Sequence, residues 1–446
     1  MNVIVELLGM RSWLFGLIAL STVLYGRILT ELGGPAVVKF FHFALVAIFA
    51  VLLLPFLSNS ISWSLMYGLL LLLWVMILSA VINNAGIINI LLDFLVLSEP
   101  FLLLVLMINQ PMSKSQIQTF RWLLVVFICI HVGLSYAQAL AGGGTDDVKG
   151  VFLEQGAGHH VAGAVALTAA VYFFTALESF SLPVRAMISL IIASVVILSD
   201  SKQVIAVFLL GLGCLLCTKL GDFRKFFLYV TLFMISAAVL LFSAFTIFPA
   251  LTTWADLNLI LKGLTVKFGI LSLIFTHYDS TLNWIFGLGP GHTVGKLAFM
   301  LPQYDEQLRS LSVSFSSVTQ HAWNYQQGNY LSHSVTGSSM WSPFFFWAGV
   351  WGDLGILGIV SYGFLWVIVI LRICTNDLAR FLAFTVLIFG IVFSWLEEPG
   401  YMLFVVTIIG LSWQEQQARL PIQSFEMERE SRNCRVNNCT NAIMRN

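Results

Sequence analysis

Long apolar runs recur from residue 12 to residue 413, and this feature constrains the fold more than any other. A helix needs about 20 apolar residues to cross the hydrocarbon core of a bilayer, and it must satisfy its own backbone hydrogen bonds there. Only 10% of the residues are charged, against about 25% in soluble domains. The sequence therefore predicts an all-α polytopic membrane protein.

The apolar runs divide into about twelve candidate spans, two of them short enough to leave the number open by one. They are 12–29, 36–57, 61–82, 86–109, 119–140, 161–179, 183–199, 203–218, 226–248, 354–373, 380–396 and 400–413. Lys and Arg crowd the short connections on the side of the N-terminus, which places both termini in the cytoplasm. Residues 1–248 thus hold nine spans, 249–343 form a large outer loop, 344–413 hold three spans, and 414–446 form a disordered cytoplasmic tail.

The loop 249–343 is longer than a simple connection requires, and its aromatic, charged and histidine residues predict a partly helical, folded cap. Its segment 256–276 repeats apolar residues at helical spacing, which predicts an amphipathic helix on the membrane surface. Lys267 flanks the apolar face of this helix. It either only extends toward water, or it holds an anionic group together with Lys202 of the tight outer turn "LSDSKQ".

The stretch "FGLGPGHT", residues 286–293, is rich in glycine like a phosphate-binding loop. It lacks the G-x-x-x-x-G-K-[ST] pattern, and no predicted strand precedes it, so a nucleotide site is not expected. We predict a sharp turn that leads from the interfacial helix into the cap, with glycines where the backbone requires them. His292 at its end is a candidate for substrate contact, as are Arg309 and Trp341 in the same loop.

Charge and spacing exclude two classes of function. The net charge is zero and the body of the chain has no basic block, so nucleic acid is not an expected partner. The loop histidines lack metal-ligand spacing, so we predict no metal and no cofactor. If the protein is an enzyme, His333 and Asp353 are the candidates for a general base that activates a hydroxyl group.

Three motifs, in their order along the chain, resemble the O-antigen ligase and polymerase superfamily of bacterial inner membranes. They are "SDSKQ" at the outer end of a mid-chain helix, the helix of Lys267 followed by "NWIFGLGPG", and "WGDLGILGIV" at 351–360. The resemblance covers most of 12–413. It implies an all-helical membrane glycosyltransferase with one large periplasmic loop, which uses undecaprenyl-diphosphate-linked sugars without a metal. It also implies that Lys202 and Lys267, at positions where the family has arginines, bind the diphosphate.

The ligases of this family carry a histidine shortly before the acidic residue of the third motif, where this chain has Phe344. We therefore expect a surface polysaccharide (O-antigen or exopolysaccharide) polymerase that joins lipid-linked repeats on the periplasmic face of the inner membrane. The resemblance implies the undecaprenyl-diphosphate-linked oligosaccharide, the bilayer and other polysaccharide-assembly proteins as partners. Two alternatives stay open: an O-antigen ligase that transfers glycan to a lipid or other acceptor, and a lipid-linked oligosaccharide flippase or another secondary transporter.

Overall fold

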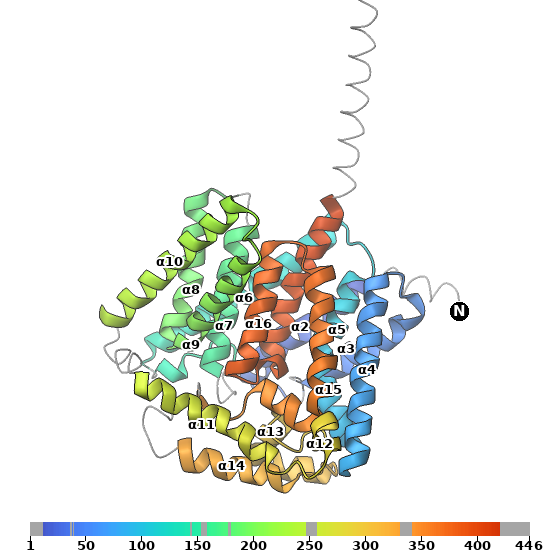
Figure 1. Ribbon diagram of the computed structural model, residues 1–446. Coiled ribbons are helices and arrows are strands. Elements are labelled where there is room, and N and C mark those ends of the chain that lie inside the picture. Colours follow the sequence, from blue (N-terminus) through green and yellow to red (C-terminus); the bar gives the residue numbers. More distant parts are fainter. Residues whose placement is uncertain are drawn as a thin grey trace, which may run out of the picture.

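The computed structural model describes residues 12–35, 38, 40–142, 145–152, 158–176, 180–246, 257–330 and 341–419, and this part consists of helices and turns without a strand. Most of the helices run side by side in a bundle, and four more lie across one end of it as a cap (Figure 1). The prediction of an all-helical protein is confirmed.

The bundle helices are as follows in chain order. They are α2 (Ser12–Glu31), α3 (Phe41–Leu53), α4 (Ser60–Asn83), α5 (Ile87–Ile108), α6 (Lys114–Leu140), α7 (Gly158–Ala176), α8 (Leu182–Leu198), α9 (Lys202–Cys217), α10 (Phe223–Thr246), α15 (Phe346–Ile368), α16 (Asp377–Val392) and the helix 399–419. Four short elements accompany them: η2 (Leu54–Phe56), η3 (Thr145–Asp147), η6 (Val369–Ile373) and η7 (Trp395–Glu397).

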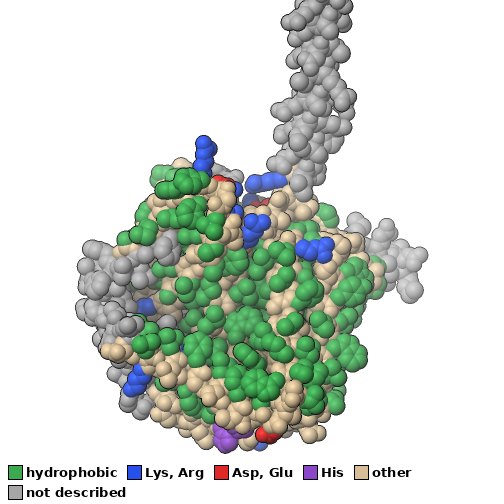
Figure 2. Space-filling model, viewed as in Figure 1, with side chains coloured by type: hydrophobic (Ala, Val, Ile, Leu, Met, Phe, Trp, Pro, Cys, Tyr) green, Lys and Arg blue, Asp and Glu red, His purple; other side chains and the backbone are tan. Residues whose placement is uncertain are grey.

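Every predicted span overlaps one of these helices. Within the described residues, five helices are long and apolar enough to cross a membrane: α4, α5, α6, α7 and the continuous helix Phe346–Ile373. Hydrophobic side chains cover the flank of the bundle, as expected for a surface in contact with lipid (Figure 2). The protein is therefore a helical membrane protein, while twelve crossings and their orientation stay predictions.

Side chains that bind the free backbone groups at helix ends define several boundaries. The Asn59 side chain accepts a hydrogen bond from the N–H of Ile61 at the start of α4 (2.9 Å), and Asn84 ends that helix in the left-handed conformation (φ 53°). Helix α6 begins with a capping box in which Ser113 and Gln116 bind each other's backbone N–H groups.

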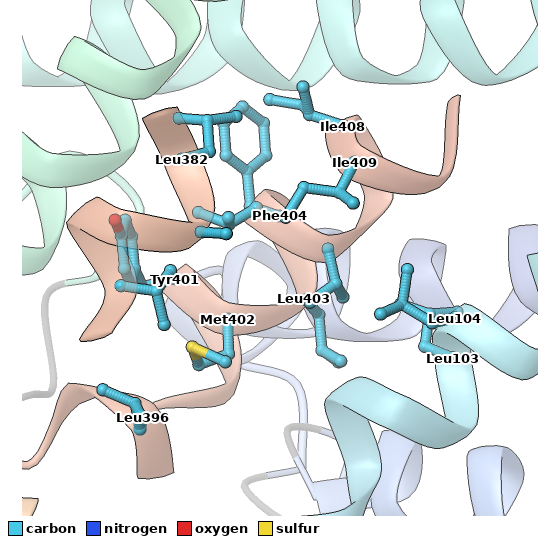
Figure 3. Packing of buried hydrophobic residues seen from close by; sticks show 14 of the residues in the cluster. Leu103, Leu104, Leu382, Leu396, Tyr401, Met402, Leu403, Phe404, Ile408 and Ile409 are labelled. Carbon is cyan, nitrogen blue, oxygen red and sulfur yellow. The ribbon is translucent and has the colours of Figure 1, made fainter. Parts of the chain in front are cut away.

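The helix 399–419 is the centre of the bundle, because residues 401–414 are buried on every side. An apolar sequence without a polar face suits a helix that is surrounded by other helices. Figure 3 shows part of this helix, Met402 to Phe404, in the same hydrophobic cluster as Leu103 of α5 and Leu382 of α16. The connection that leads into this helix is consequently held inside the protein.

The cap consists of α11 (Leu257–Phe275), α12 (Thr281–Phe286), α13 (Lys296–Ser310) and α14 (Ser317–Tyr330). Helices α11 and α12 pack against α15, and α13 packs against α5 (Figure 1). A second hydrophobic cluster joins Ile270 and Ile274 of α11 to Ala322 of α14 and Phe344. The described part of the predicted loop is therefore a folded, helical cap, as expected.

Helix α11 confirms the predicted helix but corrects the position of its lysine. Leu261 and Phe268 of the predicted membrane face are exposed, by 53% and 39%, so this face is open to the surroundings. Lys267 was expected beside that face, yet it is only 3% exposed and points into the protein. The reason is that Lys267 shares the inward side of the helix with Val266 and Ile270.

The polar tail predicted from residue 414 begins later, because the last helix continues to residue 419. Gln414 is buried, and its side-chain amide donates to the carbonyl oxygens of Met107 (2.6 Å) and Gln110 (2.8 Å). Glu415 forms an ion pair with Arg121 of α6 (2.7 Å). These polar side chains extend the helix because they find partners at the end of α5 and on α6. Residues 420–446 lie outside the described residues.

Candidate functional site

The glycine-rich loop 287–295 wraps around the carboxyl group of Asp353, which is buried in α15. The N–H groups of Gly291 and Thr293 donate to Asp353 Oδ2 (3.0 Å) and Oδ1 (2.8 Å), and the Thr293 hydroxyl group donates to Oδ1 (2.6 Å). Backbone N–H groups that point into a concavity bind an anion. Here the acceptor is a carboxyl group of the protein itself, because Asp353 binds the N–H groups of Gly291 and Thr293.

The close approach of the loop to α15 depends on two glycines. Gly287 has a φ of +73°, and a Cβ atom there would lie 2.5 Å from the carbonyl oxygen of Asp353. Gly355 has a φ of +64°, and its Cβ atom would lie 2.5 Å from the carbonyl oxygen of Ile285. Since both the backbone conformation and the lack of space favour glycine, the motifs "FGLGPG" and "WGDLG" pack against each other.

Polar side chains of the bundle fix the loop from the other side. Ser79 of α4 donates to the carbonyl oxygen of Asp353 (2.8 Å), and Asn83 of the same helix donates to that of Gly287 (3.1 Å). Asn89 of α5 donates to the carbonyl oxygen of Pro290 (3.0 Å). The loop is therefore a joint between cap and bundle that hydrogen bonds from α4 and α5 hold in place.

Segment 393–398, the short connection between α16 and the last helix that contains η7, lies next to this joint. Glu397 Oε1 accepts a hydrogen bond from the N–H of Lys296 at the start of α13 (3.0 Å). The ammonium group of Lys296 lies 3.4 Å from Glu398 Oε2. Glu397 is 4% exposed, and its Oε2 atom is buried with no hydrogen-bond partner among the described residues.

Burial raises the pKa of Glu397 to about 8; the N–H group and charge of Lys296 oppose this rise, and the carboxyl group of Asp353 adds to it. Asp93 of α5, which is also buried, interacts electrostatically with Asp353 and Glu397. The carboxyl groups of Asp353 and Glu397 thus both lie next to Gly295 where cap and bundle join, within the electrostatic range of Asp93. In the part of the chain that the structure describes, no group of His, Cys, Asp and Glu is arranged to hold a metal ion.

The two lysines predicted to bind diphosphate have different partners. The ammonium group of Lys267 donates to the carbonyl oxygens of Ser342 (3.0 Å) and Val392 (2.8 Å), and it lies 5.0 Å from the ring centroid of Phe345. Burial lowers the pKa of Lys267 to about 7. This lysine thus binds α11 to the end of α16.

Lys202 forms an ion pair with Asp200 (2.9 Å) at the start of α9. The hydroxyl group of the neighbouring Ser201 donates to the carbonyl oxygen of His159 in α7 (2.8 Å). The ring of the next residue, His160, lies 5.3 Å from that of Phe393 between centroids. Lys202 therefore lies near segment 393–398, but α7 separates the two.

Two of the residues predicted to contact substrate, His292 and Trp341, are buried in the cap. His292 is buried, and its two ring nitrogens hydrogen-bond to the carbonyl oxygen of Leu288 (3.0 Å) and to Ser314 Oγ (2.9 Å), so it stabilises the loop. Burial lowers the pKa of His292. Trp341 is buried and packs where a Cβ atom of Gly263 in α11 would lie.

Arg309 lies on the surface of α13. Its side chain is 62% exposed, and its Nε atom donates to Asp305 on the same helix (2.6 Å). An exposed pair one helical turn apart is typical of a solvated helix surface. His333, the other candidate for the general base, lies outside the described residues.

Sequence reasoning missed two residues of the site, Lys296 and Glu397. The only available signal for Glu397 is the pair of glutamates that interrupts an apolar stretch in "WLEEPGY", where charge at membrane depth indicates function. Lys296 offers no signal, because the fold alone brings the start of α13 to segment 393–398. Comparison with protein-family models, with curated proteins and with solved structures finds no match.

Proposed function

We propose that this protein is a membrane glycosyltransferase of the bacterial inner membrane, a surface polysaccharide polymerase that joins undecaprenyl-diphosphate-linked oligosaccharide repeats. The observation that carries the proposal is Glu397. It is a buried carboxyl group, one oxygen of which lacks a hydrogen-bond partner among the described residues, at the junction of an apolar bundle and a folded cap. A general base works best when its pKa lies close to the working pH, and burial brings the pKa of Glu397 to about 8.

In the proposed reaction, Glu397 Oε2 accepts the proton of an acceptor hydroxyl group as its oxygen attacks the anomeric carbon of the donor sugar. The bond between that carbon and the phosphate oxygen breaks, and undecaprenyl diphosphate leaves with the bonding electrons. A cation stabilises the leaving diphosphate. Lys296 is the candidate for this cation beside Glu397, whereas Lys202 is paired with Asp200 and Lys267 is committed to two backbone carbonyl groups.

The outer face of α11 gives a lipid-linked substrate a route to this site. Leu261, Leu264 and Phe268 are exposed on a helix that lies across the end of the bundle. Such a face enters the boundary between headgroups and acyl chains. The polyprenyl chain then stays in the membrane while the sugar reaches the cap.

The test is polymerisation by the purified protein in liposomes that contain synthetic undecaprenyl-diphosphate-linked oligosaccharide, with chain length read on a gel. Wild type is expected to lengthen the glycan, and Glu397→Gln to lower the rate by about 100-fold or more. Asp305→Asn is the matched control, because it makes the same chemical change on the exposed face of the cap. A wild-type protein that never lengthens the glycan, or a Glu397→Gln protein at the wild-type rate, refutes the proposal.

A buried pair inside the bundle favours transport as the second candidate. His42 Nδ1 of α3 and Glu99 Oε1 of α5 are 2.5 Å apart, and both side chains are buried. Ionisable residues at membrane depth mark the pathways of transporters. A transporter would move fluorescent lipid-linked oligosaccharide between leaflets without lengthening it, whereas a ligase would attach it once to an added acceptor.

A further inference from the structure

We propose that Asp353 is a positioning residue, which holds loop 287–295 so that the N–H of Lys296 stays on Glu397. This inference rests on the proposed function and changes the role expected for Asp353 from that of a general base. The carboxyl group of Asp353 accepts hydrogen bonds from Gly291 N–H and from both the N–H and the hydroxyl group of Thr293. Since both of its oxygens are bound within the protein, neither faces an acceptor hydroxyl group.

The connection from Asp353 to Glu397 runs through very few atoms. Thr293, which binds Asp353, is separated from Lys296, which binds Glu397, by Val294 and Gly295. A Cβ atom on Gly295 would lie 2.9 Å from Asp353 Oδ2 and 3.5 Å from Glu397 Oε1. The backbone at Gly295 therefore fills the space between the two carboxyl groups, and a displacement of one end of the loop is transmitted to the other.

Asp353 also acts on Glu397 through its charge, because two neighbouring carboxyl groups disfavour each other's ionised form. The ionisable groups around Glu397 come from three helices and from the segment itself: Asp93 of α5, Asp353 and Tyr362 of α15, Lys296 of α13, and the adjacent Glu398. A change from Asp353 to Asn removes one negative charge from this group and leaves the others in place. A role in positioning thus predicts that Asp353→Asn changes both the order of loop 287–295 and the pKa of Glu397.

The experiment compares Asp353→Asn, Thr293→Val and Thr293→Ser with wild type by hydrogen–deuterium exchange of loop 287–295 and by the pH dependence of polymerisation. In Asp353→Asn, exchange at Gly291 and Thr293 is expected to become about tenfold faster. The acid limb of kcat/KM is expected to move down by about one pH unit. Thr293→Val keeps the charge and removes one donor, so exchange rises while the acid limb stays in place. Thr293→Ser keeps the hydroxyl group and behaves as wild type.

Hydrogen exchange does not depend on activity, so it separates the two proposals. If wild type fails to polymerise while exchange rises in Asp353→Asn, the proposed function fails and the loop anchor stands. Unchanged exchange in both Asp353→Asn and Thr293→Val overturns the anchor. Reduced but measurable activity in Asp353→Asn with an unmoved acid limb overturns the link to Glu397. If Asp353→Asn does not fold, the comparison of Thr293→Val with Thr293→Ser decides.

Discussion

Replacement of Glu397 by Gln should make the protein more stable at neutral and alkaline pH. Burial raises the pKa of this carboxyl group from its ordinary 4.5 to about 8. The folded protein thus keeps a proton between pH 4.5 and 8 that the unfolded chain has lost, so stability falls as the pH rises through this window. The shift of 3.5 units (8 − 4.5) corresponds to about 5 kcal/mol at 1.36 kcal/mol per unit. Glutamine resembles the protonated group and avoids this loss.

The assay is thermal unfolding in detergent, followed by tryptophan fluorescence at pH values from 4.5 to 9. Glu397→Gln and wild type are expected to unfold at similar temperatures near pH 4.5 and to diverge steadily up to pH 8, with the variant the more stable. Asp305→Asn is the control, because this carboxyl group is half-exposed and its amide should follow wild type. Parallel curves for wild type and Glu397→Gln between pH 5 and 8 would refute the reasoning about burial.

Three further changes test other parts of the structure by the same unfolding assay. Gly355→Ala should destabilise the protein by more than about 2 kcal/mol, because Gly355 has a positive φ and no space for a Cβ atom. The control Gly363→Ala should have little effect, because the space around Gly363 is open. Equal losses of stability in the two variants would contradict the packing of the two glycine motifs. His42→Ala should cost about 1–3 kcal/mol because it removes a hydrogen-bond partner of the buried Glu99, and Glu99→Gln should cost less. Arg309→Ala should cost under about 1 kcal/mol, as for other exposed ion pairs, and should leave glycan length unchanged; shorter glycan would return Arg309 to the substrate site.

The positions of the helices could be predicted from the sequence, because length and apolarity decide which segments can satisfy their backbone in a membrane. How deeply each helix is buried in the bundle could not be predicted. The span 400–413 was the shortest predicted, yet it forms the centre of the bundle. The sequence predicts a tail from residue 414, because the partners of Gln414, the backbone groups of Met107 and Gln110, lie at the end of α5 and just after it, far away in the sequence.

The candidate site was predictable only in part. The order of the motifs indicated that the glycine loop leads into the cap, but no local pattern shows that the loop binds Asp353. Periodicity predicts the apolar face of α11 but not the position of Lys267, because the buried side of the helix, with Val266 and Ile270, is apolar as well. The ammonium group of the buried Lys267 donates hydrogen bonds to the carbonyl oxygens of Ser342 and Val392.

The ends of two helices explain why these charged residues meet. The last carbonyl groups of α16 and the first N–H groups of α13 lack partners within their helices. The C-terminal end of a helix favours a positive charge and the N-terminal end a negative charge. Lys267 binds the carbonyl oxygen of Val392 at the first end, and Glu397 binds the N–H of Lys296 at the second. These contacts use the ammonium group of Lys267 but only one oxygen of Glu397. Glu397 Oε2 is therefore left without a hydrogen-bond partner among the described residues, and the ammonium group of Lys296 lies beside the neighbouring Glu398.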